Sequence, residues 1–137
     1  MKPQYTNKKH TVIFDDHVAK NYEKDFKKKY KGLWEETKKS IKETLERIPN
    51  LYGLETLTPI CKSNKETYLL KFDFKIAKSK ISPKSSGNRC ILDVCTRSCC
   101  VKIILIYCKH HIDKPKGQET LWWKEKIKNR FGISCAS

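Results

Sequence analysis

The stretch YLLKFDFKI, residues 68–76, decides the fold class, because a large apolar residue occupies every second position in it. Side chains of a β-strand point alternately to the two sides of the sheet. One side is formed by Tyr68, Leu70, Phe72, Phe74 and Ile76. The other is formed by Leu69, Lys71, Asp73 and Lys75. The pattern therefore predicts a half-buried strand with charged residues on its second face.

Two further strands follow along the chain. The segment SPKSSGN, residues 82–88, has the proline and glycine of a turn, and residues 89–94 form the next predicted strand. After a polar link, VKIILIYC at residues 101–108 is apolar on nearly both faces, which is typical of a strand inside a sheet. Because short links join the three strands, we expect them to be antiparallel.

The chain before residue 50 has the spacing of helices. TVIF at residues 11–14 predicts a short first strand, and Asp15 or Asp16 would cap a helix that runs to Tyr30. Apolar residues recur there at every fourth position, opposite a lysine-rich face. A second helix is expected over residues 33–48, antiparallel to the first and joined to it by a short turn.

The remaining segments complete one α+β domain. A short strand is expected near residues 57–61, and residues 119–131 predict a last helix. The inner face of that helix would include Trp122, Trp123, Ile127, Arg130 and Phe131. We expect a flexible leader at 1–10, a single domain at 11–131 and a C-terminal tail at 132–137. In that domain the N-terminal helical hairpin packs on a small twisted, mainly antiparallel sheet.

The chain is strongly basic, with 30 Lys and Arg against 15 Asp and Glu and a formal net charge of +15. Such a surplus favours polyanionic partners and counts against a hydrolase built on paired carboxylates. Thirteen basic and four acidic residues lie between positions 62 and 116, where the strands are predicted. A basic sheet face would suit a phosphate backbone. The alternative is a sheet edge that lysines keep soluble.

The seven cysteines raise the question of a metal site. Cys95 and Cys99 have a spacing that a zinc knuckle allows, and His110 and His111 follow in the sequence. Free cysteine is also a common core residue. We therefore expect reduced, mostly buried thiols and no metal.

A membrane span is not expected. The longest uncharged apolar run, residues 103–108, is far shorter than the roughly 20 residues that a bilayer requires. Residues 1–10 carry positive charge without the apolar stretch of a secretory signal. These features predict a cytoplasmic protein.

In their order along the chain, these segments resemble the RelE/ParE superfamily of bacterial toxins, and the RelE-like branch more closely. The resemblance is carried by the helical hairpin with DFKKKY (25–30), the strand YLLKFDF (68–74), the turn SSGNR (85–89) and the strand IILIYCKHH (103–111). It spans about residues 12–131, and the ordered set carries it more than any one motif.

The resemblance implies a toxin that enters the ribosomal A site, cleaves mRNA and is held inactive by a cognate antitoxin. In this family the RNA's own 2′-hydroxyl attacks the adjacent phosphate, and no metal or other cofactor is needed. The chemistry requires cations to stabilise the phosphorane and an acceptor for the 2′-hydroxyl proton. It also requires an acid for the leaving 5′-oxygen.

The family's functional residues can be placed on this sequence. Arg89 matches the arginine of the S-G-x-R turn, which contacts the scissile phosphate through its forked guanidinium. Lys71 matches the basic residue of the preceding strand. His110 or His111 matches the residue after the last central strand, and an imidazole there can protonate the leaving group. The expected catalytic set is Lys71, Arg89 and His110. Further substrate contacts are expected from Lys75, Lys78, Lys80, Lys84, Lys109 and His111.

The sequence departs from the family in two places and leaves alternatives open. Several residues are inserted before Ser85, and the tyrosine that some members carry after the last strand is absent. Arg89 could instead form an ion pair with Asp73 or Asp93. The alternative functions are a ParE-like toxin that binds DNA gyrase, and a nucleic-acid-binding module without catalysis.

Overall fold

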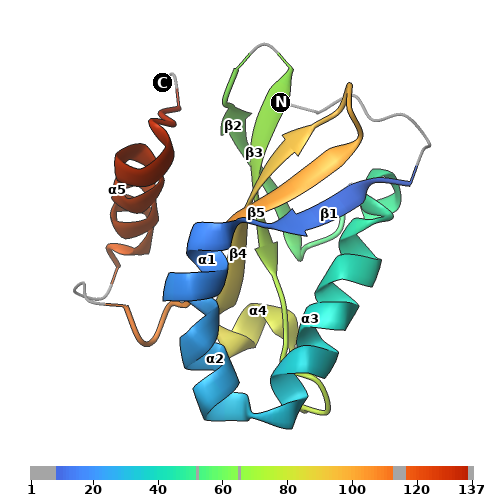
Figure 1. The fold of residues 1–137 in the computed structure, drawn as a ribbon, viewed down its shortest axis with the longest axis vertical. Coiled ribbons are helices and arrows are strands. Elements are labelled where there is room, and N and C mark those ends of the chain that lie inside the picture. The colour runs from blue at the N-terminus through green and yellow to red at the C-terminus, as the bar shows by residue number, and fades with distance from the viewer. Residues whose placement is uncertain (1–8, 52, 65, 113–116, 136–137) are drawn as a thin grey trace.

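One five-stranded sheet runs through the described part of this computed structural model, which comprises residues 9–51, 53–64, 66–112 and 117–135 (Figure 1). The strands are β1 (Thr11–Phe14), β2 (Leu57–Lys62), β3 (Thr67–Asp73), β4 (Asn88–Cys95) and β5 (Cys100–Cys108). Their spatial order is β1-β5-β4-β3-β2. β1 runs parallel to β5, and all other neighbours in the sheet are antiparallel. The predicted α+β class with a mainly antiparallel sheet is confirmed.

Three helices cover one face of the sheet. They are α1 (Asp16–Asn21), α2 (Glu23–Tyr30) and α3 (Gly32–Leu45). The first predicted helix is therefore divided at Tyr22, and Asp15 caps its first part by accepting a hydrogen bond from the His17 amide. α3 ends at Leu45 and a 3-10 turn, η1 (Ile48–Leu51), follows. The predicted extension to Ile48 is wrong, since a proline at position 49 disfavours helical geometry in the residue before it.

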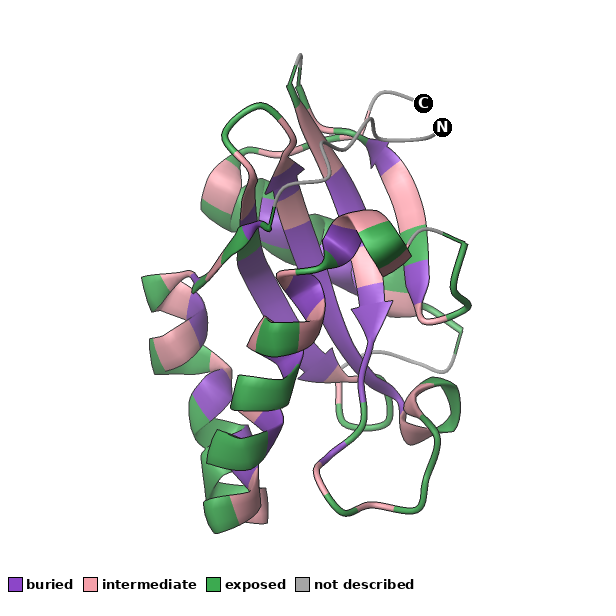
Figure 2. Ribbon diagram, turned by 90° about the vertical axis from the view of Figure 1, so that its right-hand side faces the viewer, coloured by how far each residue is buried: buried purple, intermediate pink, exposed green. Residues whose placement is uncertain are grey.

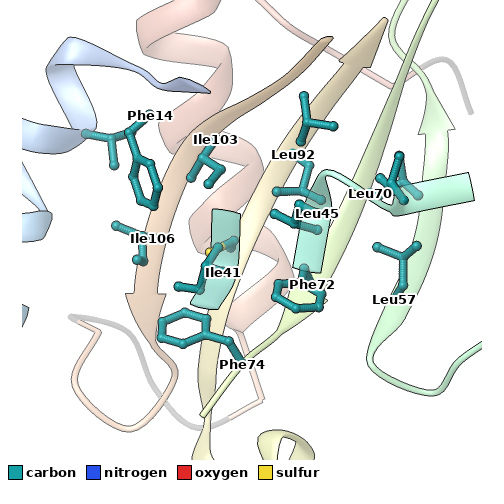
Figure 3. Close-up of a cluster of buried hydrophobic side chains, with 14 of the residues drawn as sticks. Phe14, Ile41, Leu45, Leu57, Leu70, Phe72, Phe74, Leu92, Ile103 and Ile106 are labelled. Carbon is teal, nitrogen blue, oxygen red and sulfur yellow. The ribbon is translucent and has the colours of Figure 1, made fainter. Parts of the chain in front are cut away.

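The main core lies between these helices and the sheet (Figure 3). Phe72 and Phe74 contribute to it from β3 and just beyond, and Ile41 and Leu45 from α3. The predicted alternation over residues 68–76 is thus confirmed, because its apolar set faces the helices. β3 itself ends at Asp73, three residues earlier than predicted.

The opposite face of the sheet is covered by α5 (Glu119–Phe131), whose bounds agree with the prediction. Its buried residues pack on the strands in a second cluster that includes Leu69, Ile91, Leu105, Trp122, Trp123 and Ile127. In Figure 2 buried residues follow the strands, and exposed ones lie on the outer sides of the helices. The expected open basic sheet face is therefore not found, and Arg130, placed on the inner side of α5 by the prediction, is exposed.

A short helix, α4 (Pro83–Ser86), stands where the sequence predicted only a turn. The Ser82 hydroxyl caps it by accepting a hydrogen bond from the Ser85 amide at 3.3 Å. Ser86 donates its hydroxyl to the Phe74 carbonyl at 2.7 Å, which joins this helix to the end of β3. The chain then enters β4 through Gly87 in the left-handed conformation (φ +78°).

A disulfide joins Cys61 of β2 to Cys135, beyond the end of α5. The expectation that the thiols are reduced is wrong for this pair, and the predicted tail is attached to the sheet as far as residue 135. The expectation of mostly buried thiols also fails, because Cys90 alone among the free cysteines of the described residues is buried; the others are half-buried. None of the helices in the described residues is both long and apolar enough to cross a membrane.

The disulfide gives a first prediction. Replacing Cys135 by serine should lower the free energy of unfolding by up to about 4 kcal/mol, because the bond closes a long loop and restricts the unfolded chain. Urea denaturation of the wild type and the variant, with and without a thiol reductant, measures this. Cys100→Ser, at a half-buried free cysteine, is the matched control. An unfolding midpoint of the wild type that reductant leaves unchanged would contradict the prediction.

Candidate functional site

A row of three polar residues crosses the three central strands at one end of the sheet, on the face that α5 covers. Asp73 of β3 is the register partner of Arg89 of β4, and Arg89 is the partner of Tyr107 of β5. All three are buried, with Asp73 6% and Arg89 5% exposed. A buried charge is tolerated only with a partner, so the contacts of Arg89 define the site.

Each of the three nitrogen atoms of the Arg89 guanidinium lies close to an oxygen atom of the protein. Its Nε lies 3.1 Å from Oδ1 of Asp73, in the geometry of an ion pair more than of a directed hydrogen bond. Its two Nη atoms donate to the backbone carbonyls of Pro83, Asn88 and Lys84 at 3.2–3.3 Å. Of the two carboxylates considered from the sequence, Asp73 is therefore the partner of Arg89.

Glu119, the first residue of α5, completes this group. Its Oε2 accepts a hydrogen bond from the Tyr107 hydroxyl at 2.5 Å and lies 3.9 Å from Nε of Arg89. Burial, and then the bond to Glu119, raise the pKa of Tyr107, so that it stays a neutral donor. We call Asp73, Arg89, Tyr107 and Glu119 the buried network. It ties three strands to the beginning of α5.

Two lysines stand close to this network. Burial raises the pKa of Asp73 above its usual range, although Arg89, Lys71 and Lys109 oppose the shift. Lys71 is half-buried on the same face of β3, two residues before Asp73, and Lys109 is exposed just beyond β5.

His110 lies against Gly87, next to Lys109. The Lys109 amide donates to the Gly87 carbonyl at 2.8 Å, and a Cβ added at Gly87 would lie 2.7 Å from Cδ2 of His110. A side chain at position 87 would collide with the imidazole and would also strain the backbone. We call Lys71, Lys109 and His110 the cationic rim, because they border the buried network from two segments, β3 and the turn that follows β5.

The four other predicted lysines have different surroundings. Lys75 donates its ammonium to the Ser79 carbonyl at 3.3 Å. Lys78 borders a cavity with residues of the helical hairpin, on the other side of the sheet, and Lys80 lies exposed in the same loop. Lys84 is exposed in α4, and its backbone carbonyl, not its side chain, contacts Arg89.

Tyr107 and Glu119 were not found by sequence reasoning. The pairing of β4 with β5 shifts between Ile91 and Leu92, where Ile104 is an extra residue in β5. Such a bulge changes the face on which later side chains lie. Counting alternate residues from the beginning of β5 therefore places Tyr107 on the wrong face of the sheet. For Glu119, no sequence pattern indicated a contact with the sheet.

The buried network gives a second prediction. Asp73→Asn should destabilise the protein by about 3 kcal/mol, because it leaves the Arg89 guanidinium buried without its counter-charge. Asp93→Asn is the matched control, since Asp93 is half-buried and accepts a hydrogen bond from the Ser63 hydroxyl.

A double-mutant cycle sharpens the test. Chemical denaturation should show that Asp73→Asn combined with Arg89→Gln destabilises less than the sum of the two single changes. Strictly additive effects would show that the two side chains do not act as a pair.

Comparison with known proteins adds no family: no family model, no curated protein and no solved structure matches this chain. Within the described residues, no three His, Cys, Asp or Glu side chains gather closely enough to hold a metal ion. What the chain does is therefore inferred from the site itself.

Proposed function

We propose that this protein is a metal-independent endoribonuclease that cleaves ribosome-bound mRNA, as the toxin of a type II toxin–antitoxin system. One observation carries the proposal. The sheet places Lys71 of β3 two residues from the Asp73–Arg89 pair. It places Lys109 and His110, beyond β5, against Gly87, two residues before Arg89, although up to 39 residues separate these side chains in the sequence. These are the residue types that phosphate cleavage through the 2′-hydroxyl requires.

The burial of Arg89 changes its proposed role. Its charge faces Asp73 and three backbone carbonyls, so it holds α4 and β4 in position and is a positioning residue. In this proposal Lys71, which is half-buried, and Lys109, which is exposed, make the phosphate contacts. Ammonium groups at such sites neutralise phosphate charge and bind a polyanion in a salt-dependent way.

In the proposed reaction the 2′-oxygen bonds to the adjacent phosphorus and the bond from phosphorus to the 5′-oxygen breaks. The products are a 2′,3′-cyclic phosphate and a free 5′-hydroxyl. His110 protonates the leaving 5′-oxygen. The other imidazole of the same turn, His111, is the candidate acceptor for the 2′-hydroxyl proton. Both histidines are exposed to solvent.

A second candidate function is favoured by a specific observation. Because the Arg89 guanidinium is occupied within the protein, the strongest bidentate phosphate ligand of the predicted set is withdrawn from the surface. An RNA-binding module without catalysis fits that arrangement. It shares the cationic rim with the nuclease and differs from it only in leaving bound RNA intact.

The proposed substrate places the protein in the cytoplasm and gives it an antitoxin partner. An antitoxin segment that covers the cationic rim would carry acidic residues, and its binding would weaken with salt. The Cys61–Cys135 bond favours an oxidising compartment over the cytoplasm, since disulfides persist mainly in oxidising surroundings. The site does not depend on that bond directly, because neither cysteine belongs to the network or the rim.

The proposal predicts that induced expression produces new 5′-hydroxyl ends in translated mRNA and arrests growth. Changing Lys71, Lys109 and His110 together to alanine should reduce cleavage by about a hundredfold or more, since an acid and two phosphate contacts are lost. Mapping of mRNA 5′ ends measures this. Cleavage by the purified protein should persist in the presence of a metal chelator.

The matched control replaces three exposed lysines of α2, Lys24, Lys27 and Lys28, by alanine and removes a similar charge from residues outside the rim. Equal loss in the control would contradict the site. RNA binding without cleavage by the wild type would select the non-catalytic module. A DNA-damage response with intact mRNA would instead identify a gyrase inhibitor.

A further inference from the structure

A cavity of about 320 Å³ lies beside the cationic rim, between α2, the end of β5 and α5. Tyr22, at the end of α1, and Phe26 and Tyr30 of α2 border it on one side, and Trp122 of α5 borders it on another. Its volume is at the lower end of the range for small-molecule sites. Of the residues predicted to contact substrate, His111 is the one that lines this cavity.

The cavity exists because β1 is short. β1 pairs only with residues 100–103 of β5, and Asp15 then leaves the sheet after a last amide bond to the Ile103 carbonyl. Among the described strands none continues along that side of β5. Ile106, Tyr107 and Cys108 therefore border an opening and not a neighbouring strand.

The lining combines aromatic rings with cations. The Tyr107 and Trp122 rings lie 5.0 Å apart and are tilted against each other. The Lys126 ammonium stands 5.7 Å from the centre of the Trp122 ring, and that of Lys29 stands 5.3 Å from the Tyr30 ring. Both lysines line the cavity, one from each of the helices that flank it.

We propose that this cavity binds one nucleotide of the RNA. Every nucleobase has a flat face that stacks on aromatic rings. The phosphate of a nucleotide pairs with ammonium groups. The cavity offers both aromatic rings and ammonium groups. A purely apolar ligand would leave the ammonium groups of Lys29 and Lys126 without a partner on the ligand. Asp25 and Asn21, which also line it, carry oxygen atoms that can accept hydrogen bonds from ribose hydroxyls or base amino groups.

This inference rests on the proposed function, because the nucleotide would belong to the strand that is cut. His110 packs against Gly87 in the cationic rim, and the next residue, His111, lines the cavity. One turn of chain thus borders both places. A base in the cavity would fix which phosphate of the strand lies against Lys71 and Lys109.

Binding can be measured without any cleavage, by titrating the purified protein with AMP and following tryptophan fluorescence. We expect saturable quenching of Trp122, which the variant Trp122→Phe should abolish. Ribose 5-phosphate, which lacks the base, and adenosine, which lacks the phosphate, should bind more weakly. Lys29→Ala with Lys126→Ala should weaken AMP binding roughly fivefold or more through loss of two charge contacts. Lys28→Ala with Lys124→Ala, on the same helices but outside the cavity, should leave it unchanged.

The proposal is overturned if AMP gives no saturable quenching, if ribose 5-phosphate binds as tightly as AMP, or if the control pair weakens binding as much as the cavity pair. Its failure differs from that of the proposed function. A wild type that binds AMP but leaves RNA intact refutes the nuclease and keeps the nucleotide site. Cleavage of a short RNA by the Lys29/Lys126 variant with unchanged KM refutes the nucleotide site and keeps the nuclease.

Discussion

The ion pair between Asp73 and Arg89 is the constraint on which the rest of the structure depends. Removing two opposite charges from water is unfavourable unless each keeps the other and gains further polar contacts. Arg89 does so by donating to carbonyls of α4 and of its own strand, and these contacts hold it where its charge faces Asp73. The same demand brings Glu119, and with it the beginning of α5, to this end of the sheet.

A second buried charge, Glu23, lies on the other side of the sheet and is stabilised differently. Glu23 is fully buried beneath the helical hairpin, where it accepts a hydrogen bond from the Trp34 indole and pairs with the Lys38 ammonium at 2.7 Å. There the cation reaches in from the surface along an aliphatic stem. At Arg89 the cation is itself in the interior. A net charge of +15 thus includes cations that hold the fold together and others that face solvent.

Local patterns of the sequence were sufficient for most of the fold. Alternation located β3, the apolar run located β5, and α5 agreed at both ends, because these elements follow from periodicity within a few residues. The network required knowledge of pairing across strands, which the bulge at Ile104 hides from any count along the chain. The disulfide was also beyond reach, since sequence alone does not give the connectivity of seven cysteines. Lys71, Lys109 and His110 were all named from the sequence, and their roles stay predictions. The burial of Arg89 was not predicted.

The bond between Cys61 and Cys135 turns the second half of the protein into a covalent ring. The ring contains β3, β4, β5 and α5, and therefore every residue of the buried network and the rim, whereas β1 and the helical hairpin lie outside it. Within the ring, the cystine holds the chain just beyond the C-terminal end of α5 against β2, and Glu119 makes the ionic and hydrogen-bonding contacts described at the beginning of the helix. The two ends of α5 are thus fixed by different means: a covalent bond that a thiol reductant can break, and a carboxylate contact beside Arg89 that substitution of Glu119 would remove.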